Sequence, residues 1–262
     1  KSPDELLPDQ TADKDTITLM LVEGLAETDI VSEIGKAFGI HPLVVEDILN
    51  THQRPKFEEY DEYLFIVLKC LLPEEGHFAI SYEQISLLVL DNFVLVFKEK
   101  EDGLLAPVME RIRMSKGRLR RMGTDYLAYV ILDTIVDSHF VLLDLLDDTV
   151  ESIEDDLFNE ETDRDTLNRI QRIRREVITI RRYISPTRDL MFALLRSESE
   201  LIHEKTSAYF RDVSIPSLQW GHCQRADGIG TGGTLPFLKD FFLYGLFDIS
   251  IHQDIAGLSF FN

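Results

Sequence analysis

The sequence contains little of what several classes of enzyme need. Cysteine occurs twice in 262 residues, at Cys70 and Cys223, so a disulfide framework is excluded and a reducing compartment is favoured. The seven histidines show no His-x-x-x-His spacing, and no zinc pattern is present. The sequence also lacks a Gly-x-Ser-x-Gly elbow and a Gly-x-Gly-x-x-Gly motif that follows a strand. A serine hydrolase and a dinucleotide-binding enzyme therefore find no support.

Positive charge and long apolar runs are also scarce. Lys and Arg number 27 against 47 Asp and Glu, which gives a formal net charge of −20. Such a chain would repel the phosphates of DNA or RNA, so we exclude nucleic acid as a partner. No run approaches the roughly 18 apolar residues of a transmembrane helix, and the polar first residues are unlike a signal peptide. We therefore expect the chain to be soluble.

The pattern of apolar residues predicts an α+β fold. The first half alternates between short predicted strands (16–22, 56–60, 63–72, 80–90 and 93–98) and short predicted helices (28–38, 43–49 and 104–115). Asp91 and Asn92 favour a tight turn between the last two strands. Two short helices followed by antiparallel strands indicate a mixed α/β layer domain with a mostly antiparallel sheet.

The second half predicts a long helical hairpin. From 124 to 157, apolar residues recur every three or four positions without proline or glycine, which is typical of one long amphipathic helix. A second helix over 165–195, continuing past Pro186, would return beside it after a turn at 159–163.

Charge is partitioned between these two helices. Residues 133–163 contain twelve acids and no Lys or Arg, whereas residues 164–188 contain eight arginines. We interpret most of this pattern as a solvated face with pairing between the helices. An acidic surplus remains after that pairing, so we expect a cation to help to hold it.

Carboxylates are the remaining groups that could carry chemistry. Glu46 and Asp47 are adjacent on the predicted helix 43–49, Asp133 and Asp137 lie one turn apart on the long helix, and Asp212 ends a Tyr-Phe-Arg-Asp cluster. Crowded carboxylates repel one another and need a counter-ion, and oxygen ligands without Cys or His suit Mg²⁺ or Ca²⁺. No EF-hand loop is present.

Each of these groups is also compatible with a purely structural role. Glu46 fits an exposed helix acid, Asp133 a hydrogen-bond partner of a tyrosine or arginine, and Asp212 a partner of the neighbouring arginine. Among the histidines, His41 fits a helix cap, and His139 fits an interior position better than a ligand position.

The segment that begins at Gly39 resembles the signature of the CorA family of magnesium and cobalt transporters. Over 39–56 it reads Gly-Ile-His-Pro-Leu-Val-Val-Glu-Asp-Ile-Leu-Asn-Thr-His-Gln-Arg-Pro-Lys. Further matches follow in order: Tyr-Leu-Phe-Ile-Val-Leu-Lys (63–69), Arg-Ile-Arg (111–113), Asp-Tyr-Leu (125–127) and Tyr-Phe-Arg-Asp-Val (209–213). The resemblance covers about residues 16–213, which is most of the chain.

The resemblance implies a homopentameric funnel. Its α/β domain and helical hairpin would lie on the cytoplasmic side of the cell's inner or plasma membrane, and a stalk helix would lead to two membrane helices per subunit. It also implies regulatory Mg²⁺ ions, with Co²⁺ as a substitute, between neighbouring subunits. Carried over, Asp47 would face Asp212 of the adjacent subunit, and Glu46 with Asp133 would build a second site nearby. The implied function is metal sensing and gating of a Mg²⁺/Co²⁺ channel-transporter, and not an enzymatic one.

The chain also departs from the family pattern. The Gly-Met-Asn pore motif and both membrane helices are absent, and the match ends after Val213, where Pro216 interrupts the expected stalk. We therefore expect an α/β domain (1–120), a hairpin with the start of the stalk (121–213) and a foreign glycine-rich tail (214–262). We expect an N-terminus trimmed relative to the family, and weak or no self-association, down to a monomer, in this form. Two alternatives stay open: a zinc-exporting relative of the same fold, and a stand-alone acidic scaffold without specific metal binding.

Overall fold

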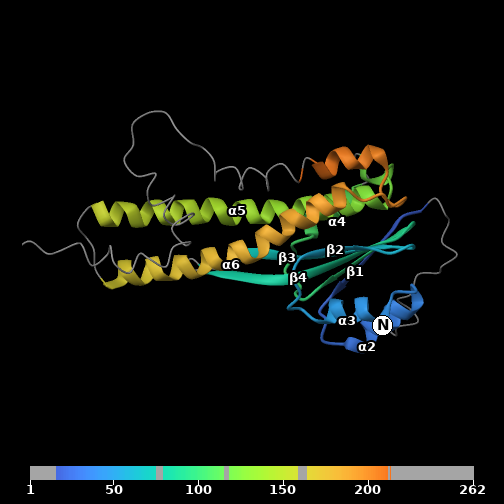
Figure 1. Cartoon of the computed structure of the whole chain (residues 1–262), viewed down its shortest axis with the longest axis horizontal. Coiled ribbons are helices and arrows are strands. Elements are labelled where there is room, and N and C mark those ends of the chain that lie inside the picture. The colour runs from blue at the N-terminus through green and yellow to red at the C-terminus, as the bar shows by residue number, and fades with distance from the viewer. Residues whose placement is uncertain (1–15, 75–78, 115–117, 159–163, 212, 214–262) are drawn as a thin grey trace, which may run out of the picture.

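One central sheet organises the described part of the protein (Figure 1). The computed structural model describes residues 16–74, 79–114, 118–158, 164–211 and 213. The sheet has the strand order β1-β5-β4-β3-β2. Its strands are β1 (Thr18–Glu23), β2 (Lys56–Glu59), β3 (Leu64–Pro73), β4 (Ile80–Val89) and β5 (Phe93–Lys98). Only β1 and β5 pair in parallel, so the expected mostly antiparallel sheet is confirmed.

The helices lie on both faces of this sheet. They are α2 (Thr28–Ala37), α3 (Pro42–Leu49), α4 (Ala106–Arg113), α5 (Thr124–Phe158) and α6 (Arg164–Leu195), with a further helical segment over 204–211. Most of these bounds agree with the predicted ranges to within two residues, and the α+β fold is confirmed. The predicted turn at 159–163 and the tail 214–262 lie outside the described residues.

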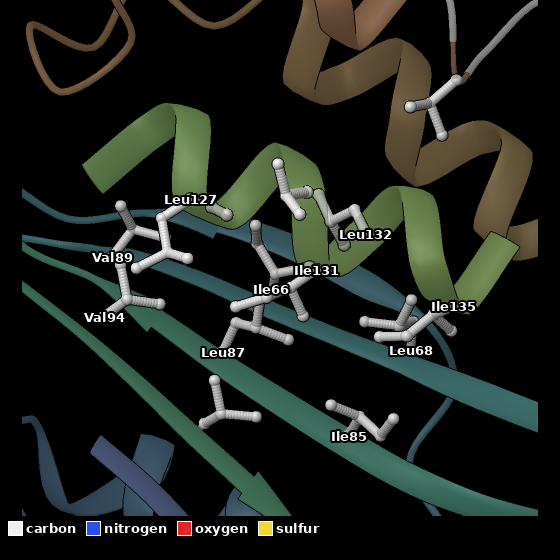
Figure 2. Packing of buried hydrophobic residues seen from close by; sticks show 14 of the residues in the cluster. Ile66, Leu68, Ile85, Leu87, Val89, Val94, Leu127, Ile131, Leu132 and Ile135 are labelled. Atoms are coloured by element: carbon white, nitrogen blue, oxygen red, sulfur yellow. The ribbon is translucent and has the colours of Figure 1, made fainter. Parts of the chain in front are cut away.

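Strand β3 separates the core into two halves. Its residues alternate between the faces, so Leu64, Ile66 and Leu68 pack on one side, and Phe65 and Val67 pack on the other. The first set contacts α5, as Figure 2 shows for Ile131 and its neighbours above β3 and β4. The second set contacts α2 and α3. Helices α3 and α5 therefore lie on opposite faces of the sheet (Figure 1).

Helices α5 and α6 form the predicted antiparallel hairpin, which extends past the end of the sheet (Figure 1). Their shared apolar seam includes Leu142, Leu146 and Val150 on α5, and Ile173 and Val177 on α6. Continuation of α6 through Pro186, which cannot donate a helical hydrogen bond, is also confirmed.

The expected pairing of charge between the two long helices is confirmed at one position. The Arg169 guanidinium of α6 contacts the Asp156 carboxylate of α5 and donates to Ser152 Oγ at 3.1 Å. Both charged side chains are about one-third exposed, so the pair adds at most about 1 kcal/mol to stability.

One sequence expectation needs correction. Helix α5 is long and apolar enough to cross a membrane, with a mean hydropathy of 1.5 over an 18-residue window. Its apolar side chains do not form one continuous run, so a search for such a run does not detect it. In the structure its apolar face is buried against β3 and β4, and Ile131, Leu132 and Ile135 are fully enclosed. The hydropathy of α5 is therefore that of a core helix.

The two isoleucines Ile131 and Ile178 provide a matched test of this core. Ile131 on α5 is 0% exposed, whereas Ile178 on α6 is 51% exposed. We expect Ile131→Ala to lower the free energy of unfolding by about 2–5 kcal/mol, because it leaves a cavity between α5 and the sheet. The same substitution at Ile178 should change it by less than about 0.5 kcal/mol. Urea unfolding measures both, and equal losses would contradict the assigned packing.

Candidate functional site

The motif that begins at Gly39 forms the turn and the N-cap that start helix α3. Gly39 adopts a left-handed φ of +67°, which ends α2 and turns the chain back. His41 is the N-cap of α3: its Nδ1 accepts a hydrogen bond from the Leu43 amide at 3.2 Å, so the expected cap is confirmed. Pro42 follows in the first turn. The His41 amide also donates to Tyr63 Oη at 3.1 Å, which ties the start of α3 to the sheet.

The end of α3 is held by two polar residues inside the sheet. Gln84 and Lys69 are cross-strand partners on β4 and β3, and both are 0% exposed. Gln84 Nε2 donates to the Asp47 carbonyl at 3.0 Å, and its Oε1 accepts from Lys69 Nζ at 3.3 Å. Lys69 Nζ also donates to the Thr51 carbonyl. Burial lowers the pKa of Lys69, and its ammonium contacts the Thr51 carbonyl in the turn that follows α3.

Asp47 is the best-placed candidate ligand. It lies in the last turn of α3 with its side chain 22% exposed. Its Oδ1 accepts from Gln53 Nε2 at 2.6 Å, and its Oδ2 accepts from Lys56 Nζ at 2.6 Å. Burial alone would lower the pKa of Lys56. Its contacts with Asp47 and with Glu58 Oε1, at 2.7 Å, outweigh burial and raise this pKa. Within one chain, therefore, the Lys56 ammonium already neutralises the Asp47 carboxylate.

The three predicted ligands that the structure describes, Glu46, Asp47 and Asp133, do not lie together on one face of the sheet. Glu46 is exposed on α3, next to Asp47. Asp133 is half-buried on α5, on the opposite face of the sheet. Asp212 lies outside the described residues. Within the part of the chain that the structure describes, no three His, Cys, Asp or Glu side chains form a group that could hold a metal ion.

The segment that leads to Asp212 is fixed at the start of α5. The buried Asp125 carboxylate accepts hydrogen bonds from the Tyr126 amide at 2.8 Å and from the His203 amide at 2.9 Å. Tyr209, on the helical segment 204–211, packs edge-on against Tyr126 with ring centroids 5.1 Å apart. Two motifs more than 75 residues apart in the sequence are thereby joined on the α5 side of the sheet.

A separate charged group is built around Lys98 at the end of β5. Its ammonium, 0% exposed, lies 3.5 Å from Glu83 Oε1 and 3.7 Å from Glu23 Oε1, and it also contacts Asp102. Burial raises the pKa of Glu83 to about 7. Despite its own partial burial, hydrogen bonds from Glu83 and Lys98 lower the pKa of Asp102 to about 2. The buried Lys98 ammonium therefore balances the negative charge of these surrounding carboxylates.

Four polar residues near the candidate site were not predicted from the sequence: Gln53, Lys56, Lys69 and Gln84. Lys69 was detectable, because it is a polar residue that interrupts the otherwise apolar strand β3, whereas Gln84 lies next to Glu83 in a strand of mixed polarity. The contact of Lys56 with Asp47 carried no local signal. It depends on where β2 lies relative to α3, which only the folded sheet decides.

A family model and individual relatives place this chain among the same group of proteins. The family model described as CorA-like Mg2+ transporter protein matches residues 26–218. The cobalt/magnesium transport protein CorA of Thermotoga maritima is 40% identical over 207 residues, which are 79% of this chain and 59% of that protein. The putative metal ion transporter YfjQ of Bacillus subtilis is 31% identical over 176 residues, 67% of this chain and 53% of that protein. The chain thus spans between half and three fifths of the length of these relatives.

Solved structures share the fold at lower identity. The soluble domain of CorA from Methanocaldococcus jannaschii has a TM-score of 0.63 and 23% identity, covering 74% of this chain and 76% of that chain. The complete CorA magnesium transporter of the same organism has a TM-score of 0.66 and 21% identity, covering 81% and 66%. The ZntB cytoplasmic domain from Vibrio parahaemolyticus has a TM-score of 0.58 and 16% identity, covering 80% and 85%. These likenesses concern the fold alone.

The Gln84 anchor can be tested by removing its amide. Gln84→Leu should lower the free energy of unfolding by about 1–3 kcal/mol, because the carbonyls at the end of α3 and the Lys69 ammonium lose a buried partner. Gln171→Leu, the same change at an exposed position of α6, is the control and should alter stability by less than about 0.5 kcal/mol. Chemical denaturation of both variants would refute the anchor if their losses were equal.

His139 provides a test by pH. Its Nε2 lies 2.8 Å from the Lys69 carbonyl, and burial lowers its pKa to about 4, so it is an interior histidine, as expected. In the unfolded chain, His139 becomes protonated below about pH 6.5. In the folded chain, it becomes protonated only below about pH 4. Stability should therefore fall as pH drops through this window, by on the order of 3 kcal/mol.

The control for this titration is His139→Gln, which retains an N–H donor for the Lys69 carbonyl but has no proton to gain. Between pH 6.5 and 4.5 its stability should fall less steeply than that of the wild-type protein. Identical slopes in denaturation experiments across this range would show that His139 does not titrate as its burial requires.

Proposed function

The chain belongs to the CorA-like Mg²⁺ transporter family, and we propose that it is the metal-sensing and gating part of a divalent-cation channel-transporter. It would lie on the cytoplasmic side of a membrane, with the membrane helices in a longer protein. We assign it no enzymatic activity. The regulatory ion would be Mg²⁺, with Co²⁺ as a substitute, as the names of the relatives suggest.

The observation that carries this proposal is the placement of the acids on two opposite faces. Glu46 and Asp47 belong to α3, whereas Asp133 and the segment before Asp212 belong to the α5 side of the sheet. One chain therefore presents two different acidic surfaces, which could meet only if neighbouring chains pack head to tail. Such heterologous contacts generate a ring when the rotation between neighbours closes, which is the arrangement of the homopentamer that the resemblance implies.

The residues fit a weakly held magnesium ion. Carboxylate oxygens are the ligands that Mg²⁺ prefers, and it usually keeps several waters and takes only one or two carboxylates. Asp47 of one subunit and Asp212 of the next would share one ion, and Glu46 with Asp133 of the next would hold a second ion nearby. When bound, the ion would supply the positive charge that lets these acids approach one another.

Gating follows from where these ligands would lie. Carboxylates on separate subunits hold an ion only while the subunits are close, so they bind it more tightly in the closed ring than in an opened one. A ligand shifts an equilibrium by this difference in affinity. At high Mg²⁺ concentration the closed state would be favoured, and at low concentration the repulsion between acids would loosen the ring.

Two other functions compete with this one. An acidic scaffold that binds no specific ion is favoured by the Asp47–Lys56 pair, since Asp47 is neutralised within its own chain at 2.6 Å. A zinc-exporting relative would share the fold, but ligands that are all carboxylates suit Zn²⁺ less well than Mg²⁺.

Titration with Mg²⁺ separates these possibilities. We expect a saturable rise in the melting temperature of the full chain at about millimolar Mg²⁺, because an ion bound only by the folded state stabilises it. Sedimentation under the same conditions should show Mg²⁺-dependent association. Asp47→Asn and Asp212→Asn should lose both effects, whereas Asp137→Asn, at an exposed position of α5, should retain them.

The outcomes discriminate cleanly when ionic strength is kept constant. No shift at millimolar Mg²⁺, or a shift that persists in Asp47→Asn, would support the acidic scaffold instead. A stronger response to Zn²⁺ than to Mg²⁺ and Co²⁺ would favour the zinc exporter.

A further inference from the structure

A lysine occupies the position beside Asp47 where a cation is needed. Lys56 Nζ lies 2.6 Å from Asp47 Oδ2 and 2.7 Å from Glu58 Oε1, so one ammonium bridges a carboxylate of α3 and a carboxylate of β2. Lys56 directly follows the Asn-Thr-His-Gln-Arg-Pro connection between the two elements. The sheet, by placing β2 next to the end of α3, brings these three charges together.

The two carboxylates are oriented by neutral donors. Gln53 Nε2 donates to Asp47 Oδ1 at 2.6 Å, and Tyr60 Oη donates to Glu58 Oε2 at 3.0 Å. The remaining oxygen of each carboxylate points at the same ammonium. The Lys56 side chain also passes the ring of Phe65, with Nζ 5.2 Å from its centroid. Each member of the group is thus positioned by more than the ion pairs alone.

The ion pairs are exchangeable because they are only partly buried. The side chains of Lys56, Asp47 and Glu58 are 27%, 22% and 35% exposed. Water and salt weaken ion pairs at such positions, so the ammonium can swing out on its flexible stem without leaving a charge stranded in the core. A divalent ion could then take its place at Asp47.

We propose that Lys56 is a tethered competitor of Mg²⁺, which occupies the cation position at Asp47 in the metal-free protein and must leave for the ion to bind. This inference rests on the proposed function of Asp47 as a ligand. Lys56 would lower the affinity of the site in two ways, by occupying it and by repelling a double charge a few ångströms away. It would also neutralise Asp47 when the ion is absent, which would keep the empty site folded.

The same role accounts for the ion pair that otherwise favours an acidic scaffold. If the ammonium were only a structural partner, Asp47 would have no further cation to bind. If it is a competitor, the pair is the ion-free state of a switch, and its strength sets the Mg²⁺ concentration at which the switch responds.

Removal of the charge tests the proposal. In Lys56→Gln, the midpoint of a Mg²⁺ titration of the full chain, followed by calorimetry and by melting temperature, should fall about tenfold. Lys56→Arg keeps the charge, so its midpoint should stay within about threefold of the wild-type value. Lys36→Gln, which removes a charge from an exposed position at the end of α2, controls for net charge and should leave the midpoint unchanged.

The double variant Asp47→Asn/Lys56→Gln assigns the gain to this site, because tighter binding should disappear when the carboxylate is removed. A midpoint in Lys56→Gln equal to that of the wild-type protein, with a response that still needs Asp47, would overturn the competitor role and leave the proposed function intact. A response that depends on Asp47 and appears only in Lys56→Gln would support the competitor role and contradict metal sensing by the wild-type chain. No response in either protein would overturn both.

Discussion

Burial of the central strands on both faces is the constraint on which the rest of this structure depends. Because β3 alternates between two apolar cores, α3 and α5 must cover opposite sides of the same sheet. The acids on these two helices are consequently kept apart within one chain. The arrangement that buries the core therefore also determines that any ion shared by both surfaces would have to lie between copies.

The few polar residues inside that apolar sheet connect the core with the surface. Lys69 and Gln84 are completely enclosed, so their hydrogen-bonding groups must find partners in the protein. They find them in the carbonyls of α3 and of the turn after it, which satisfies the helix end and fixes its position. The hydrogen-bonding requirement of these buried residues thus fixes the end of α3, and with it the position of Asp47.

The parts of this structure that local patterns govern could be predicted from the sequence, and the parts that depend on contacts between distant segments could not. The periodicity of 124–157, the Asp91-Asn92 turn and the His41 cap each act over a few residues, and each is confirmed. The placement of Asp47 on a short helix followed in the same way. Its partner Lys56 did not, because α3 and β2 meet only through the register of β2 with β3. The burial of α5 was equally hidden, since it depends on the sheet beneath it.

The two lysine–carboxylate groups show how burial decides whether a charge can be exchanged. Lys98 is 0% exposed, and withdrawing it would leave the Glu83 carboxylate, which is 1% exposed, without a cation in the interior. Its position is therefore permanent, and the group is structural. Lys56 neutralises Asp47 with similar geometry but at 27% exposure, where solvent can replace it. In a chain with a net charge of −20, such an accessible pair is where the proposed competition between Lys56 and a divalent ion would take place.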